Sequence, residues 1–190
     1  MARRLGVTSI LRLLLLRHAK SDWSEELDDH ERPLSSRGKK AAPKIGSYMH
    51  SKGYEPALVL CSTARRTRET LDLVLPKLRT KPKILHQRAL YLADWPHLLA
   101  TVRKTKPVSP VLLVGHNPGM EQLAIALALH PKNPAERGRA ERLAQKFPTG
   151  ALAVLDFDVK TWSAIAPGAG TLADYIRPKD LVDHAVGHGK

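Results

Sequence analysis

The sequence predicts an α/β protein with three layers, in which a mainly parallel sheet lies between helices on both of its faces. Short apolar runs alternate along the chain with stretches whose apolar residues recur at helical spacing. The runs are continuous, as is typical of parallel strands that are buried on both faces. A chain of 190 residues suits one domain, so we expect a single domain over 1–190 with its core at about 11–181.

Six apolar runs are expected to form the strands of this sheet. They are residues 11–16, 57–61, 84–86, 110–115, 151–157 and 161–166. The first includes four consecutive leucines at residues 13–16, a pattern typical of a fully buried strand. Cys61 stands at the end of the second strand, where we expect it to be buried.

Helices are expected between these strands. Apolar spacing predicts one helix at about 35–52, with Gly53 as its C-cap, and another from about residue 64. A later helix is expected to begin with Asn117 as its N-cap and Pro118 in its first turn.

Two segments are expected to lie outside the regular elements. Residues 19–33 form a long loop that holds six of the eighteen acidic residues, and long loops beside a site often act as lids. Residues 130–148, rich in Pro, Lys, Arg and Glu, are expected to form a small, exposed basic insertion.

The net charge of +13 raises nucleic-acid binding as one alternative function. However, aromatic residues make up only 5% of the chain, so there are few side chains on which bases could stack. Basic and acidic residues also alternate in much of the sequence. Composition therefore disfavours this class but leaves it open.

Cysteine content and hydropathy indicate the compartment. The single cysteine excludes a disulfide within the chain and suits a reducing environment. The apolar run near the start is short and Arg12 interrupts it, so a strand is expected there rather than a signal peptide. No run approaches the ~18 apolar residues of a membrane span. We expect a cytoplasmic protein without a membrane partner.

Phosphate-binding residue types follow three of the expected strands. Arg17 and His18 follow the first strand, Arg65 and Arg66 follow the second, and His116 follows the strand at 110–115. Because the carboxyl ends of parallel strands meet at one edge of a sheet, these side chains are expected to lie close together. Arginine binds phosphate through a planar fork of donors, and a neutral imidazole can attack phosphorus. The pattern indicates phosphoryl chemistry.

These segments, with several others, resemble the histidine phosphatase superfamily and, within it, the SixA-type phosphohistidine phosphatases. The matching segments are Arg17-His18-Ala19-Lys20-Ser21-Asp22-Trp23, Asp29-His30-Glu31-Arg32-Pro33-Leu34, Leu90-Tyr91-Leu92-Ala93, Pro148-Thr149-Gly150-Ala151 and Ile176-Arg177-Pro178-Lys179-Asp180-Leu181. The superfamily usually has glycine after the Arg-His pair, whereas Ala19 stands here, as in many SixA-type chains. The resemblance implies a phosphoglycerate mutase-like fold.

The resemblance also implies a mechanism. His18 would attack phosphorus and form a phosphohistidine, which water then hydrolyses. Arg17, Arg66 and His116 would surround the phosphoryl oxygens, and Arg66 rather than its neighbour matches the family pattern because it lies four residues before Thr70. Since arginines supply the positive charge, neither a metal ion nor a cofactor is expected.

Other site residues are less well marked. Ser62 and Asn117 are candidates for hydrogen bonds to phosphate or to the histidines, and Asp22, Asp29 and Asp94 are candidates for a general acid. A phosphorylated imidazole leaves more readily than an alkoxide, so a phosphohistidine substrate reduces the need for an acid. The short chain also leaves few residues for a cap over the pocket. We therefore expect a phosphohistidine-bearing protein as substrate, with a small phosphorylated metabolite, phosphoserine or phosphothreonine as alternatives.

Overall fold

The computed structural model describes residues 10–24 and 26–181, and the other residues of the expected 1–190 domain lie outside this description. Its centre is a six-stranded sheet with the strand order β3-β2-β4-β1-β5-β6. The strands are β1 (Ile10–Arg17), β2 (Leu58–Ser62), β3 (Lys83–Gln87), β4 (Val111–Gly115), β5 (Leu152–Asp158) and β6 (Thr171–Ile176). The strands β3, β2, β4 and β1 pair in parallel, whereas β5 and β6 pair antiparallel. The predicted α/β class with a mainly parallel sheet is confirmed.

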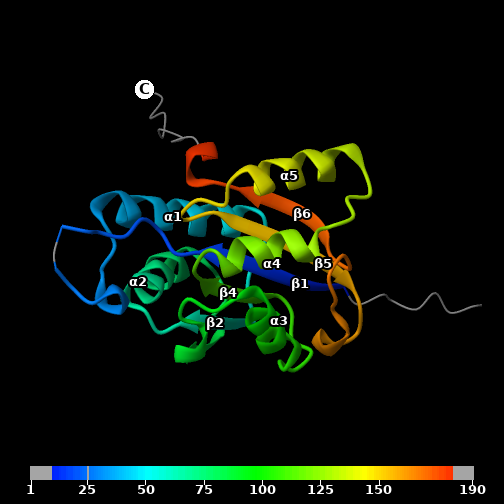
Figure 1. Ribbon diagram of the computed structural model, residues 1–190, viewed down its shortest axis with the longest axis horizontal. Helices are drawn as coiled ribbons and strands as arrows, with labels where there is room; N and C mark the ends of the chain where they lie inside the picture. Colours follow the sequence, from blue (N-terminus) through cyan, green and yellow to red (C-terminus); the bar gives the residue numbers. More distant parts are fainter. Residues whose placement is uncertain (1–9, 25, 182–190) are drawn as a thin grey trace, which may run out of the picture.

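Five α-helices cover the sheet (Figure 1). They are α1 (Ser36–Ser51), α2 (Arg65–Val74), α3 (Trp95–Arg103), α4 (Gly119–Leu127) and α5 (Pro134–Gln145). Short 3-10 turns join them: η1 (Asp29–Glu31), η2 (Leu75–Lys77), η3 (Arg88–Leu90), η4 (Trp162–Ala164) and η5 (Pro178–Asp180). None of the helices in the described ranges is both long and apolar enough to cross a membrane.

The leucines of β1 show how the sheet separates two cores. Leu13 and Leu15 pack into the core shared with α3, α4 and α5, whereas Leu14 and Leu16 pack into the core shared with α1 and α2. Successive side chains of a strand point to opposite faces, so a strand covered on both sides must be apolar throughout. All four leucines are almost completely buried, as predicted.

The helix predicted at about 35–52 is confirmed as α1. The Ser35 side chain accepts a hydrogen bond from the Gly38 amide and so caps its first turn. After the helix, Gly53 has a φ of 69°, the left-handed conformation that glycine adopts most readily at a helix end.

Two sequence predictions about secondary structure are wrong, and a third segment is more ordered than expected. Residues 161–166 do not form a strand: they contain η4, and the edge strand is β6 at Thr171–Ile176. Trp162 in this turn is fully buried, and its indole nitrogen donates to the Val108 carbonyl oxygen. The apolar residues of this segment therefore reflect the packing of a turn and not a strand.

The residues before α4 also differ from the prediction. Asn117 is not the N-cap, because the helix starts at Gly119 and Pro118 takes the N-cap position. The Asn117 side-chain amide donates instead to Glu121 and to the Phe147 carbonyl oxygen.

The segment 130–148 is not simply exposed, because it contains α5. Glu136 and Leu143 on this helix are buried. The Glu136 carboxylate accepts hydrogen bonds from the Lys132 and Leu172 amides, which ties α5 to the edge strand β6. Of the basic residues on this helix, Arg137 is exposed, whereas Arg139 donates to the Leu172 carbonyl oxygen and Arg142 donates to Asp180.

Candidate active site

A cavity of about 280 Å³ lies at the carboxyl edge of the parallel strands. The side chains around it come from the ends of β1 and β4, the start of α2, the loop at 20–32, the segment after η3 and the segment before β5. They are Arg17, His18, Lys20, Ser21, Trp23, Asp29, Arg32, Arg66, Leu92, His116, Asn117 and Thr149. Four residues predicted from the strand ends, Arg17, His18, Arg66 and His116, are thus brought together in one cavity.

His18 follows β1 directly and is only 7% exposed. Its Nδ1 lies 2.7 Å from the Ala19 carbonyl oxygen, which can only accept, so Nδ1 carries the hydrogen and Nε2 holds the free lone pair. Burial, together with the charges of Arg66, Arg17 and Arg32, lowers the pKa of His18 to about 3, although the bond to Ala19 opposes this shift. The imidazole is therefore neutral near pH 7.

His116 lies beside His18, with 5.3 Å between the two ring centroids. Its Nε2 is 2.8 Å from Oγ of Ser62, which sits at the end of β2 and is fully buried. Burial and the neighbouring His18 and Arg66 lower the pKa of His116 to about 3. This second imidazole is also neutral near pH 7.

Arg66 lies in the first turn of α2 and is 2% exposed. Its Nη2 donates to Oδ2 of Asp29 at 2.9 Å, and its Nη1 donates to the Asp29 carbonyl oxygen. The turn is tied to β1 because Thr70 donates to the Arg66 carbonyl oxygen and accepts from the Ala19 amide. These bonds fix Arg66 next to His18.

Asp29 gathers three partners on its carboxylate: Arg66, Arg32 and the Tyr91 hydroxyl. Partial burial would raise the pKa of Asp29, but the bonds from Tyr91 and Arg66 outweigh it and lower this pKa to about 2. The carboxylate is therefore ionised near neutral pH and holds the two arginines in position.

Arg17 and Asn117 are held on the other side of the cavity by one acceptor. The Arg17 Nη1 and the Asn117 Nδ2 donate to the Phe147 carbonyl oxygen, at 2.8 and 3.1 Å. Phe147 follows α5, so the helix that the sequence did not predict positions one of the site's arginines.

Buried polar atoms without a partner cluster around this cavity. Among the described residues they include Nε of Arg17, Arg32 and Arg66, Nη1 of Arg32, Nδ1 of His116 and Oδ1 of Asn117. Five of these six atoms are nitrogens, four of them on charged guanidinium groups, so an anion that entered the cavity could accept hydrogen bonds that the protein itself leaves unmade.

The remaining predicted residues are placed differently. Ser62 does not line the cavity but touches His116 from behind. Asp22 accepts from the Ser24 amide, and Asp94 caps α3 by accepting from the His97 amide, and neither lines the cavity. Of the three candidate acids, only Asp29 reaches the site.

Two residues that bond to Asp29 were not predicted as site residues. Arg32 is 7% exposed and its guanidinium lies 3.3 Å from the centre of the Trp23 ring, while Tyr91 contacts both Asp29 and the His116 ring. Both lie in segments that carry the family resemblance, and that position was the available signal.

The described residues were also compared with the requirements of a metal site. In the two described ranges, no cluster of three or more His, Cys, Asp or Glu side chains could hold a metal ion.

Comparisons with known proteins point to one family. The model of the histidine phosphatase superfamily (branch 1) matches residues 13–91. An uncharacterized protein of Mycobacterium tuberculosis is 32% identical over 165 residues, which cover 86% of this chain and 100% of that protein. An uncharacterized chloroplastic protein of Arabidopsis thaliana is 36% identical over 128 residues, which cover 62% of this chain and 59% of that protein.

Solved structures extend the similarity to the whole fold. A protein of Agrobacterium tumefaciens assigned as the phosphohistidine phosphatase SixA is 31% identical, with a TM-score of 0.73. The matched region covers 88% of this chain and 98% of that protein. A protein of Nakamurella with the same assignment is 29% identical, with a TM-score of 0.75. The matched region covers 90% of this chain and 97% of that protein.

Proposed function

The chain belongs to the histidine phosphatase superfamily, and we propose that it removes phosphoryl groups from phosphohistidine on proteins through a covalent intermediate on His18. The observation that carries this proposal is the state of the His18 ring. Its Nδ1 donates a hydrogen bond to the Ala19 carbonyl oxygen. The low pKa of the ring leaves Nε2 unprotonated in a cavity rich in cations. A neutral, oriented imidazole is a competent nucleophile toward phosphorus.

The first step forms a bond between His18 Nε2 and phosphorus and breaks the bond between phosphorus and the substrate nitrogen. The substrate ring carries a proton on its other nitrogen, so the electron pair of the broken bond stays on a leaving imidazole that departs neutral. In the second step, water attacks the phosphorylated His18, giving inorganic phosphate and restoring the free ring. Both steps need the reacting groups held in line, which the bond from His18 to Ala19 provides.

Charge on the transferred oxygens is stabilised by Arg17, Arg66 and His116. The arginines offer buried N–H groups that have no partner in the protein. Ser62 Oγ accepts from the Ala64 amide, so its own hydrogen can be donated to Nε2 of His116. The hydrogen of His116 then sits on Nδ1, which is buried and unpaired, as a donor for a phosphoryl oxygen. The reaction proposed in this way requires no metal ion.

A carboxylic acid has no part in the proposed steps. Asp29 is held ionised by Tyr91 and the arginines, so it is a poor proton donor at neutral pH. An imidazole leaves without a proton donor far more readily than an alkoxide does. The site therefore fits phosphohistidine better than phosphoserine or phosphothreonine.

A protein substrate is supported by the rim of the cavity. Trp23 is 71% exposed and Leu92 is 52% exposed, and both line the opening. Leu92 has a φ of 50°, a conformation that costs free energy for a leucine and is held here at the site. Exposed apolar side chains beside a charged pocket are typical of surfaces that contact another protein. A cytoplasmic location belongs to the same proposal.

The experiment measures phosphate release from a phosphohistidine-bearing protein and from an aryl phosphate, with a chelator present. It compares the native chain with His18→Ala and with His86→Ala, which removes an exposed histidine on β3 that does not line the cavity. We expect release that His18→Ala abolishes, that His86→Ala preserves, and that favours the protein substrate.

Other outcomes separate the alternatives. Preference for the aryl phosphate would redirect the proposal to a small phosphorylated metabolite, and dependence on added metal would contradict metal independence. Absence of release from both substrates, together with salt-sensitive binding of an oligonucleotide, would favour a nucleic-acid-binding protein instead.

A further inference from the structure

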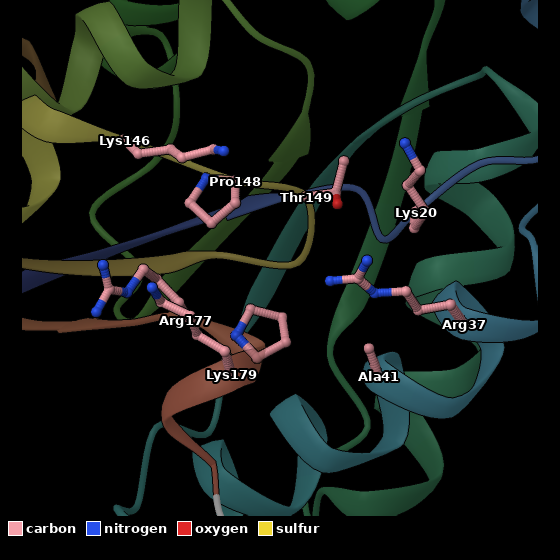
Figure 2. A pocket seen from close by; sticks show the side chains of 9 residues that line it. Lys20, Arg37, Ala41, Lys146, Pro148, Thr149, Arg177 and Lys179 are labelled. Atoms are coloured by element: carbon pink, nitrogen blue, oxygen red, sulfur yellow. The ribbon is translucent and has the colours of Figure 1, made fainter.

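A second cavity, of about 170 Å³, opens beside the catalytic cavity. Its lining residues are Lys20, Arg37, Ala41, Lys146, Pro148, Thr149, Arg177, Pro178 and Lys179. Lys20 and Thr149 also line the catalytic cavity, so the two are neighbours. Figure 2 shows Arg37 pointing from α1 into the space between Thr149 and the segment that carries Lys179.

A third cavity, of about 440 Å³, continues from the second along α1. It is lined by Ser36, Arg37, Lys40, Ala41, Lys44, Pro178 and Lys179, four of which also line the second cavity. We call the second and third cavities together the basic groove. Along α1 the groove extends from Arg37 to Lys44, which is about 10 Å of helix. This length exceeds the reach of a small phosphate monoester bound at His18.

Most cations of the basic groove lack a carboxylate partner among the described residues. Within the same residues, the lining of the groove contains no Asp or Glu. Five of its cations are exposed side chains that make no ion pair within the described part of the chain: Lys20, Arg37, Lys40, Lys146 and Lys179. Arg177 differs, because Asp180 holds it through two hydrogen bonds and neutralises it.

The chemistry of the groove selects among anions. In the part of the chain that the structure describes, its lining contains no Phe, Tyr or Trp on which a nucleic-acid base could stack. Its free cations are mostly flexible lysines spread along a surface, rather than buried arginines that converge on one point. Dispersed lysines suit a series of separate carboxylates better than a single second phosphate.

We propose that the basic groove binds an acidic segment of the protein substrate, whose carboxylates lie next to the phosphorylated histidine held in the catalytic cavity. This inference rests on the proposed function, because it names the class of protein that the site would serve. Exposed charges act mainly on encounter and on salt dependence, so the groove should lower KM for acidic substrates and leave kcat unchanged.

The test uses the double variant Arg37→Glu/Lys179→Glu, which reverses two charges that line both parts of the groove but not the catalytic cavity. Its matched control is Lys104→Glu/Lys106→Glu, an equal charge change at exposed positions just before β4, at the opposite edge of the sheet. Fluorescence anisotropy measures binding of a labelled, unphosphorylated, glutamate-rich peptide at low and at high salt. This readout does not depend on catalysis.

We expect the groove variant to bind the acidic peptide roughly tenfold more weakly at low salt, with the difference vanishing at high salt. The control variant should bind like the native chain. In kinetics, KM for a phosphohistidine peptide with acidic neighbours should rise, while kcat for an aryl phosphate stays unchanged. Thermal unfolding of both variants checks that the fold is intact.

Three results would overturn the inference: equal weakening in both double variants, unchanged peptide binding in the groove variant, or tighter binding of an oligonucleotide that is lost with the same substitutions. Failure of the proposed function appears separately, as absence of phosphate release by the native chain. The peptide-binding result remains decisive in that case, because it is measured without turnover.

Discussion

His18 combines a fixed tautomer with a depressed pKa, and both follow from one local arrangement. The ring is buried beside three arginines, and a backbone carbonyl oxygen occupies Nδ1. Nitrogen-15 NMR of the imidazole rings tests this directly. We expect His18 to show the Nδ1–H tautomer and no titration between pH 5 and 8. A midpoint near 6.5 would contradict the proposed nucleophile.

Ser62 acts through His116 and not on the substrate. We expect Ser62→Ala to lower kcat by up to about 100-fold, because His116 loses the bond that orients it, while KM changes little. Ser47→Ala, an exposed change on α1, is the control and should leave kcat unchanged. A rise in KM at constant kcat would show that Ser62 contacts the substrate instead.

The sequence predicted the residues at strand ends well, because a buried strand fixes where its last side chain lies. The four residues Arg17, His18, Arg66 and His116 meet in one cavity for that reason. The candidate acids could not be ranked, since Asp22, Asp29 and Asp94 all lie in loops or caps. Only the folded contacts show that Asp29 joins the arginines and that Asp94 serves α3.

At the scale of elements, close contact between α1 and the loop after β1 sets the position of His18. A Cβ added at Gly38 would lie 2.2 Å from the Lys20 carbonyl oxygen. We expect Gly38→Ala to lower the free energy of unfolding by about 2–3 kcal/mol and to reduce activity, because the backbone beside His18 must shift. Urea unfolding and phosphate release measure the two effects.

Gly138 on α5 provides the matched control. A Cβ added there meets nothing within 4 Å. Because alanine is the better helix former, we expect Gly138→Ala to raise the free energy of unfolding by up to about 1 kcal/mol and to leave activity unchanged. Equal effects of the two substitutions would contradict the contact proposed for Gly38.

Helices and strands were predicted correctly where an apolar pattern extends over many residues. They were predicted incorrectly where a single tertiary contact determines the local structure. The run of leucines in β1 and the amphipathic α1 were both recognised. The strand predicted at 161–166 is wrong because Trp162 is apolar and buried in a short turn, and its apolar character resembles that of a strand residue. The start of α4 was predicted incorrectly because the Asn117 side chain donates to Glu121 and to the Phe147 carbonyl oxygen instead of capping the helix, and no pattern in the sequence reveals these contacts.

For the whole molecule, the two buried histidines link stability to pH. Their folded pKa values of about 3 lie below the ordinary value of 6.5, so the unfolded chain binds more protons between these limits. Stability is therefore expected to fall as pH drops below 6.5, by on the order of 2 kcal/mol per histidine at pH 5. Asp29 does not contribute in this window, because its stabilisation is lost only below about pH 3.8.

Urea unfolding at pH 7.5 and pH 5 measures this difference. His18→Ala should reduce the loss of stability at pH 5, because one of the two proton-binding groups is then absent. An identical pH dependence in the native chain and in His18→Ala would show that His18 is not held neutral by the fold.

The central claim is that phosphate passes through His18. The most direct measurement mixes the enzyme with phosphohistidine substrate, stops the reaction in alkali, where phosphohistidine survives, and locates the modified residue by mass spectrometry. We predict phosphate on His18 in the native chain and none in His18→Ala. Phosphate on another residue, or turnover without a phosphorylated enzyme, would contradict the proposed mechanism.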